Sequence, residues 1–275
     1  MLSLNQFRRQ RPLVDCITNT VTINFVANAI LAAGGSPVMA EEPQEIDEFT
    51  AISSAVMLNI GTAFQMFLPH FSAALDSAKR HGKPVVLDPV GAGASRFRLE
   101  LIRKLLAANA VAVIRGNASE IRAVAGDNAL TARGVDADAG DNVTDQTLDR
   151  HLEITRQMAE KFQCVVAQSG AIDIITDGRR AVLCRNGVPQ MSQVTGTGCA
   201  LGGLTAAWCG AFPAQPLEAS ATAYAMMGLA GERAWQYCVD GHAGTGTLAQ
   251  RLLDELYLMD DDALQAGGKL EEVAL

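Results

Sequence analysis

Short apolar runs alternate with segments of helical periodicity along most of this chain. The runs cover residues 12–17, 55–61, 84–88, 110–116 and 164–170. After the first run, Ile23, Val26 and Ile30 recur at helical spacing, and Gly34 follows as a helix-ending residue. Strands of parallel sheets are buried on both faces and therefore read as continuous apolar runs. The alternation predicts an α/β fold with a mostly parallel central sheet, covered by helices on both faces.

The second half of the chain departs from this alternation. Residues 173–176 and 181–184 flank Asp177-Gly178, a hairpin signal that predicts an antiparallel edge. Residues 126–145 lack apolar periodicity and are rich in Gly, Asp and Asn, as in a long surface loop. Helices are expected over 217–237 and 247–259, whereas the tail 260–275 is expected to fray. We find no linker or repeat, which indicates one domain over residues 1–275.

Composition narrows the range of partners and locations. A net charge of −8 argues against nucleic acid as a partner, and Arg8, Arg9 and Arg11 are expected to be solvated on a frayed terminus. Six cysteines without a C-x-x-C pair read as reduced thiols, and the first 25 residues lack the apolar run of a signal peptide. We therefore expect a cytoplasmic protein. Residues 194–212 are apolar, but their glycines and the following Pro213 favour a buried helix and no membrane partner.

The loop Thr195-Gly196-Thr197-Gly198-Cys199 leads directly into an apolar helix. Such a loop aims backbone N–H groups and a helix N-terminus at one point, where an anion would bind. Glycines let a phosphate approach the backbone closely. The alternative is a tight strand-to-helix turn with a buried cysteine. A P-loop enzyme is excluded, because the chain has no G-x-x-x-x-G-K-[ST] motif.

Two acidic residues follow successive predicted strands. Asp88 ends the strand 84–88, and Glu120 lies shortly after the strand 110–116. Ligands gather at the carboxyl ends of parallel strands, and two carboxylates there would suit Mg²⁺. Each acid also has a purely structural alternative. Asp88 precedes Pro89 as a turn residue would, and Glu120 stands at the capping-box position relative to Asn117.

Further polar residues are expected at the same edge. Arg115 offers a permanently charged donor that suits a phosphate, although an ion pair would explain it equally well. Ser169 follows another strand and would offer a hydroxyl to the same nucleotide, or serve only in a turn. Four residues near the ends of the first two strands, one amide and three apolar, would either line a substrate pocket or belong to the core. They are Asn19, Val21, Pro37 and Met39.

Seven segments, taken together and in order, resemble the hydroxyethylthiazole kinase family. They are Cys-Ile-Thr-Asn at 16–19, Ala-Gly-Gly-Ser-Pro-Val-Met-Ala at 33–40, Leu-Asn-Ile-Gly-Thr at 58–62, Leu-Asp-Pro-Val-Gly-Ala-Gly at 87–93, Arg-Gly-Asn-Ala-Ser-Glu-Ile at 115–121, Arg-Gly-Val-Asp at 133–136 and Thr-Gly-Thr-Gly-Cys-Ala-Leu at 195–201. Each segment alone is a weak signal, whereas the combination is specific. The resemblance implies a ribokinase-like fold and ATP-dependent phosphorylation of the primary alcohol of 5-(2-hydroxyethyl)-4-methylthiazole, a salvage step toward thiamine. It also implies Mg²⁺ and a homotrimer with substrate pockets between neighbouring subunits.

The resemblance also implies roles for individual residues. Met39 would contact the thiazole, with Asn19, Val21, Pro37 and Gly196 nearby. Arg115 and Ser169 would contact ATP, and Asp88 and Glu120 would hold the metal and phosphates. Three positions depart from the family pattern. Asp15 stands where the family usually has His, placing a negative charge near the expected site; Ser169 replaces a usual Thr; and the loop 243–247 differs.

The residues of the loop 195–199 that we expect to take part in catalysis are Thr197, Gly198 and Cys199. Phosphoryl transfer depends on positioning and electrostatics and scarcely needs a strong base. In related sugar kinases an Asp occupies the position of Cys199. We expect the helix N-terminus to ionise part of the thiol, so that it orients the hydroxyl and assists deprotonation without being phosphorylated. The alternatives are a kinase for a sugar or a pyrimidine alcohol, a cysteine acyl transferase with a nearby His, and a noncatalytic nucleotide sensor.

Overall fold

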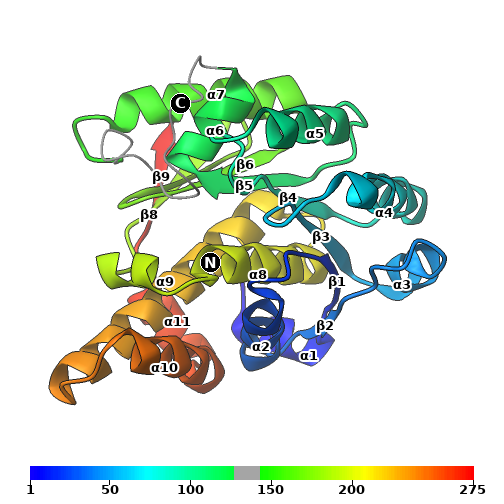
Figure 1. Ribbon diagram of the computed structural model, residues 1–275. Helices are drawn as coiled ribbons and strands as arrows, with labels where there is room; N and C mark the ends of the chain where they lie inside the picture. The colour runs from blue at the N-terminus through cyan, green and yellow to red at the C-terminus, as the bar shows by residue number, and fades with distance from the viewer. Residues whose placement is uncertain (127–142) are drawn as a thin grey trace.

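A nine-stranded sheet lies between two layers of helices (Figure 1). The computed structural model describes residues 1–126 and 143–275. Strand order is β2-β1-β3-β4-β5-β6-β7-β8-β9. The strands are β1 (Leu13–Ile17), β2 (Ser36–Val38), β3 (Ala55–Asn59), β4 (Val85–Asp88), β5 (Val113–Asn117), β6 (Val165–Ser169), β7 (Asp173–Thr176), β8 (Arg180–Cys184) and β9 (Leu270–Ala274). Pairing is parallel from β2 to β6 and antiparallel from β6 to β9, which confirms the predicted sheet and its antiparallel edge.

Each face of the sheet has its own helix layer and its own apolar core. One core includes Trp208, Tyr224 and Ile30, under α1 (Leu4–Gln10), α2 (Ile23–Ala33), α8 (Thr197–Ala211), α9 (Pro216–Asp240) and α10 (Thr245–Leu258). The other includes Phe71 and Ile102, under α3 (Ile46–Ile52), α4 (Leu68–His81), α5 (Arg96–Leu106), α6 (Ala118–Ala125) and α7 (Leu148–Phe162). The predicted two-sided cover is therefore confirmed.

The arrangement brings polar residues to one edge of the sheet. β1, β3, β4, β5 and β6 run in parallel, so the loops that follow them lie at the same side. Helix α8 packs across β1, β3 and β4, and a Cβ at its Gly202 would lie 3.3 Å from Asp88 Oδ2. The start of α8 is thus held over the strand ends by close packing.

Both termini are ordered, and the expectation that they fray is wrong. Leu4 and Phe7 of α1 are buried. Arg8 donates to the carbonyls of Leu256, Tyr257 and Met259, which helix α10 leaves without intrahelical donors at its end. The tail forms α11 (Asp261–Gly267) and then β9, which pairs with β8. These contacts join segments more than 80 residues apart, so no local pattern signals them.

Two further expectations concern cysteines and membranes. All six cysteines are free, and five of them are buried. Of the helices within residues 1–126 and 143–275, none is long and apolar enough to span a membrane. The surface loop expected over 126–145 lies largely outside the described residues, since residues 127–142 are not among them.

Candidate active site

A chain of hydrogen bonds crosses the strand ends from α8 to β4. Asn19, just after β1, donates from Nδ2 to Cys199 Sγ at 3.2 Å and to Asn59 Oδ1 at 3.0 Å. Asn59, the last residue of β3, donates from Nδ2 to Asp88 Oδ2 at 2.8 Å. Cys199, in the first turn of α8, is therefore connected to Asp88 through two amides.

Arg115 extends this arrangement toward β6. Its side chain is 8% exposed, and Nη2 donates to Ser169 Oγ at 3.0 Å. Its Nη1 lies 3.6 Å from Asp88 Oδ2. A Cβ at Gly198 would lie 3.0 Å from Nη1, so the guanidinium packs directly against the first turn of α8. Of the residues predicted for the nucleotide, Arg115, Ser169 and Asp88 thus lie together beside the 195–199 loop.

Asp88 and Glu120 are both buried and influence each other. Burial raises the pKa of Asp88 to about 6, against the opposing effect of Arg115. Burial, and then the nearby Asp88 charge, raise the pKa of Glu120 to about 7. Two carboxyl groups with raised pKa values at one site favour binding of a cation, because a cation stabilises their ionised forms.

The structural alternative for Glu120 is also present. Its Oε2 accepts from Asn117 N at 2.8 Å, and Asn117 Oδ1 accepts from Glu120 N at 2.9 Å, which completes a capping box. Its Oε1 accepts from Gly91 N at 2.9 Å, in the loop after β4. Glu120 therefore caps α6 and also ties the loop after β4 to the start of that helix.

The free carboxylate oxygen of Asp88 suits Mg²⁺, whereas both oxygens of Glu120 already accept from backbone N–H groups. Asp88 Oδ1 is buried without a hydrogen-bond partner and so has its lone pairs free. Mg²⁺ commonly takes one or two protein carboxylates together with water and substrate phosphate. In the described part of the chain, no three or more His, Cys, Asp or Glu residues gather as a metal-holding group. The fit therefore depends on phosphate oxygens and water for the other ligands.

The loop before α8 has the predicted geometry. Gly196 has φ +96° and precedes the helix, a backbone conformation that favours glycine. Thr197 N donates to the Val194 carbonyl at 3.4 Å, whereas the N–H groups of Gly198 and Cys199 that follow have no intrahelical acceptor. The Thr197 hydroxyl donates to the carbonyls of Met191 and Val194, so this side chain holds the loop.

The Cys199 thiol is not activated as expected. Burial, and then the Asp88 charge, raise its pKa, although the hydrogen bond from Asn19 opposes the shift. The expected partial ionisation by the helix N-terminus is therefore wrong. Desolvation outweighs the helix end, and the thiol is protonated near neutral pH. Its hydrogen bond with Asn19 fixes its position instead.

The predicted substrate residues lie in different surroundings. Asn19 is buried and bonded to Cys199, and Gly196 lies against Thr22. Pro37 lies in β2, the edge strand, and Met39 directly follows that strand. Val21 is 68% exposed. Among the described residues, hydrogen bonds join only Asn19 of this group to Cys199.

Asp15 lies away from the hydrogen-bonded chain. It is buried in β1, where Oδ1 accepts from Ala40 N and Oδ2 accepts from Thr50 Oγ1, both at 3.3 Å. Burial raises its pKa to about 6. The expected charge near the site therefore serves to tie β1 to Ala40, which follows β2, and to α3.

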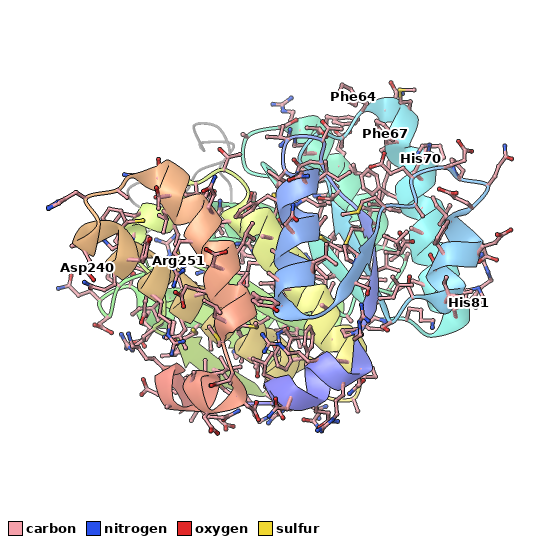
Figure 2. The ribbon with its side chains drawn as sticks, turned by 90° about the horizontal axis from the view of Figure 1, so that it is seen from below. Phe64, Phe67, His70, His81, Asp240 and Arg251 are labelled. Carbon is pink, nitrogen blue, oxygen red and sulfur yellow. The ribbon has the colours of Figure 1, made fainter. Side chains whose placement is uncertain are left out.

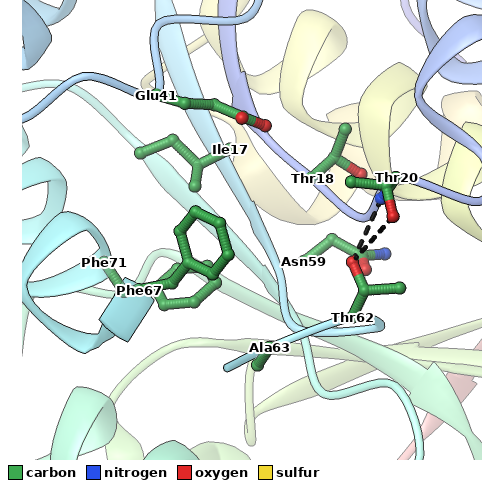
Figure 3. A pocket seen from close by; sticks show the side chains of 9 residues that line it. All are labelled: Ile17, Thr18, Thr20, Glu41, Asn59, Thr62, Ala63, Phe67 and Phe71. Atoms are coloured by element: carbon green, nitrogen blue, oxygen red, sulfur yellow. Dashed lines mark hydrogen bonds between the residues drawn. The ribbon is translucent and has the colours of Figure 1, made fainter. Parts of the chain in front are cut away.

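A small pocket opens beside the chain of hydrogen bonds, and Figure 3 shows it. The polar side of its lining is formed by Thr18, Thr20, Glu41, Asn59 and Thr62. The apolar side is formed by Ile17, Ala63, Phe67 and Phe71. Thr20 N donates to Thr62 Oγ1 at 3.1 Å and so links the loops after β1 and β3. Asn59 thus borders both this pocket and the chain to Asp88.

Two residues of this site lie outside the sequence prediction. Asn59 follows an apolar strand as Asp88 does, so its placement at a strand end was a usable signal. Asp173 accepts from Gly170 N at 2.9 Å, and burial raises its pKa to about 7 against the lowering effect of Arg115. It begins the antiparallel hairpin, where the strand-end rule for parallel sheets gives no signal.

The histidine needed by a cysteine acyl transferase is not found at Cys199. His70 and His81 lie on α4 (Figure 2), and His151 is hydrogen-bonded to Gln168 at 3.1 Å. The side chain that hydrogen-bonds to the Cys199 thiol is Asn19. Within the described residues, the thiol thus has an amide partner and no imidazole base.

Comparison with known proteins agrees with this geometry. The model of the hydroxyethylthiazole kinase family matches residues 4–262. Hydroxyethylthiazole kinase of Clostridium acetobutylicum is 40% identical over 98% of this chain and 97% of its own length. The enzyme of that name from Cereibacter sphaeroides is 42% identical over the same shares.

Solved structures give the same result. The hydroxyethylthiazole kinase protein of Pyrococcus horikoshii superposes with a TM-score of 0.86 at 35% identity, over 98% of this chain and 97% of that one. A pyridoxal kinase of Staphylococcus aureus, in complex with AMP-PCP and pyridoxal, shares only the fold, with a TM-score of 0.60 at 13% identity, over 96% of this chain and 98% of that one. The fold is therefore ribokinase-like, as expected. The chain belongs to the hydroxyethylthiazole kinase family, and it is a kinase.

Proposed function

We propose that this protein transfers the γ-phosphoryl group of ATP to the hydroxyl of 5-(2-hydroxyethyl)-4-methylthiazole, in the thiamine pathway. The observation that carries the proposal is the meeting of Arg115, Asp88 and the first turn of α8 at the strand ends. A guanidinium and a row of backbone N–H groups there stabilise the charge that spreads over a transferring phosphoryl group. The identity of the acceptor alcohol is inferred from membership of the hydroxyethylthiazole kinase family.

The nucleotide half of the site uses Arg115, Ser169, Asp88 and Glu120. Arg115 donates to phosphate oxygens, and Ser169 holds the guanidinium through its 3.0 Å hydrogen bond. Asp88, through its unpartnered Oδ1, and Glu120 would hold Mg²⁺. Magnesium bound with ATP neutralises phosphate charge and fixes the phosphates in place. The backbone of Gly196, Thr197 and Gly198 forms the cradle for the migrating group.

The acceptor half uses Cys199 as a positioning group for the alcohol. The thiol is protonated and held by Asn19, so it orients the substrate hydroxyl toward the cradle rather than attacking phosphorus. A loose transition state needs little proton removal before the new bond forms. The proton passes late in the transfer to an oxygen of the transferred phosphoryl group, when the alcohol oxygen has become acidic.

The substrate ring would lie against Met39, Val21 and Pro37 and border Gly196. Val21 is 68% exposed in one chain, so a substrate held there gains cover from a second surface. This exposure supports a homotrimer with thiazole pockets between neighbouring subunits. We also infer that residues 1–275 act as one domain, because strands from the first to the last part of the described chain belong to one sheet. The six free cysteines favour the reducing cytoplasm.

The experiment that tests the function offers alternative acceptors to one enzyme. The protein is incubated with ATP and Mg²⁺ and with the thiazole alcohol, a hydroxymethyl pyrimidine or a hexose, and the products are weighed by mass spectrometry. We expect the mass of one phosphoryl group to be added to the thiazole alcohol only. Phosphorylation of the pyrimidine or hexose instead, or ATP binding without any product, would overturn the proposal.

A further inference from the structure

Asn59 lies at the centre of the site and has no role in the reaction as described so far. The residue is 1% exposed and ends β3, where it pairs with Asp88 in the neighbouring strand β4. Its Nδ2 donates to Asp88 Oδ2 at 2.8 Å. Its Oδ1 accepts from Asn19 Nδ2 at 3.0 Å and from Gly61 N at 2.9 Å.

The Gly61 N–H group fixes the direction of this hydrogen-bond chain. Gly61 N can only donate, so Asn59 must turn Oδ1 toward it and Nδ2 toward Asp88. Because Asn59 Oδ1 can only accept, Asn19 must turn Nδ2 toward it, and the same Nδ2 then faces Cys199. A flip of Asn59 would leave Gly61 N unpaired and turn Oδ1 against the Asp88 carboxylate, which is costly.

The fixed direction has a consequence at each end of the chain. At one end, the donor from Asn59 occupies Oδ2 of Asp88, and Oδ1 of the same carboxylate stays free. At the other end, the donor from Asn19 points at the Cys199 sulfur. One residue thereby sets the orientation of a carboxylate on the nucleotide side and of a thiol on the acceptor side.

We propose that Asn59 is a positioning residue for phosphoryl transfer, which aligns Asp88 and, through Asn19, Cys199. The inference rests on the proposed function. A role confined to the turn at Gly61 would use only Oδ1 of Asn59. The bond from Nδ2 to Asp88 is therefore the feature that separates positioning from local folding.

The test replaces Asn59 by an isosteric residue that lacks the donor. In Asn59→Asp, assayed at alkaline pH so that the new carboxyl group is ionised, the carboxylate still accepts from Gly61 N and Asn19 Nδ2, but it faces Asp88 with an oxygen. We expect kcat to fall about ten- to hundredfold, as for loss of a hydrogen bond to a charged group, while KM for ATP and for the alcohol changes less than about threefold. A purely structural role would change the folded fraction and leave the kcat of folded enzyme intact.

A second readout needs neither nucleotide nor metal. Cys199 is the one cysteine of the six that is partly exposed, whereas the other five are buried, so mild alkylation labels it selectively. We expect alkylation at a fixed alkaline pH to be several-fold slower in Asn59→Asp, because added negative charge disfavours the thiolate. The alkylation rate tests the role of Asn59 even if the wild-type protein phosphorylates none of the alcohols. That result would overturn only the proposed function.

A matched control makes the same change beside another carboxylate. Asn186 Nδ2 donates to Glu232 Oε1 at 3.2 Å, between β8 and α9. Asn186→Asp should lower the melting temperature comparably, yet leave kcat and the Cys199 alkylation rate unchanged. If Asn59→Asp does not fold, Asn59→Ser, which removes the amide in a smaller side chain, decides by kcat alone. Wild-type kcat in either folded Asn59 variant, or a wild-type alkylation rate in folded Asn59→Asp, would overturn the inference.

Discussion

The Cys199 thiol belongs to the acceptor half of the proposed reaction. Its pKa is raised by burial, and Asn19 holds the sulfur. A carboxylate in its place would accept the same hydrogen bond and could also take the proton of the alcohol. Cys199 thus acts by geometry, and an acid of similar reach should replace it.

We expect Cys199→Asp to keep measurable turnover, and Cys199→Ala to lose about ten- to hundredfold in kcat because the alcohol is no longer oriented. Steady-state kinetics with ATP and the thiazole alcohol provide the measurement. Cys238→Ala, a buried cysteine on the last turns of α9, serves as the control with wild-type kcat. A folded but completely inactive Cys199→Asp would contradict this role.

Asp15 is a second residue whose burial has a measurable consequence. Its folded pKa of about 6 lies above the unfolded value of about 3.9. The folded state therefore binds more protons between these values, and stability falls as pH rises from about 4 to 6. Above about pH 6, this loss of unfolding free energy no longer changes with pH.

We expect Asp15→Asn to remove this part of the pH dependence. The amide oxygen still accepts from Ala40 N, and the amide N–H groups can donate to Thr50 Oγ1. Relative to wild type, the variant should gain about 2–3 kcal/mol of unfolding free energy between pH 4 and pH 7. Urea unfolding across this range measures the difference, and parallel curves for the two proteins would show that Asp15 does not titrate there.

At the scale of elements, two helices begin with the same Gly-Thr-Gly sequence but in different surroundings. Gly196, Thr197 and Gly198 open α8 against Arg115. Gly244, Thr245 and Gly246 open α10, where a Cβ on either glycine would meet nothing within 4 Å. The surroundings, and not the local sequence, therefore decide which of the two helix starts belongs to the site.

This pair of helices offers a matched test. We expect Gly198→Ala to lower kcat/KM for ATP by about tenfold or more, because its Cβ would lie 3.0 Å from Arg115 Nη1 and displace the guanidinium. Gly246→Ala occupies the same position of α10 and should keep wild-type kinetics with equal or higher stability. Equal kinetics for the two variants would argue against close packing of Arg115 on the cradle.

The terminal elements show where local patterns lose their predictive value. The interior strands were predicted from apolar runs, and the hairpin from Asp177-Gly178. Helix α1 and strand β9 were not, because both are short and gain their stability from distant partners. Arg8 illustrates this: it binds carbonyls of residues about 250 positions away.

At the scale of the whole molecule, the open question is the number of chains that form one site. Val21 is exposed although it is proposed to contact substrate. Light scattering should give three times the chain mass of 29.0 kDa. Val21→Asp should raise KM for the alcohol about tenfold by placing a charge against the ring, and leave KM for ATP unchanged. A monomeric wild-type protein with full activity would contradict the shared pocket.

The sequence by itself determined the parallel sheet, its antiparallel edge and the strand ends that carry Asp88, Arg115 and Ser169. Periodicity and motif order are local properties, and they survive without knowledge of distant contacts. The tertiary structure alone decided that Asn59 joins Asn19 to Asp88, that the Thr197 hydroxyl binds the loop carbonyls of Met191 and Val194 and that burial raises the pKa of Cys199. Hydrogen-bond direction and desolvation depend on which residues meet across strands, and chain order does not specify these.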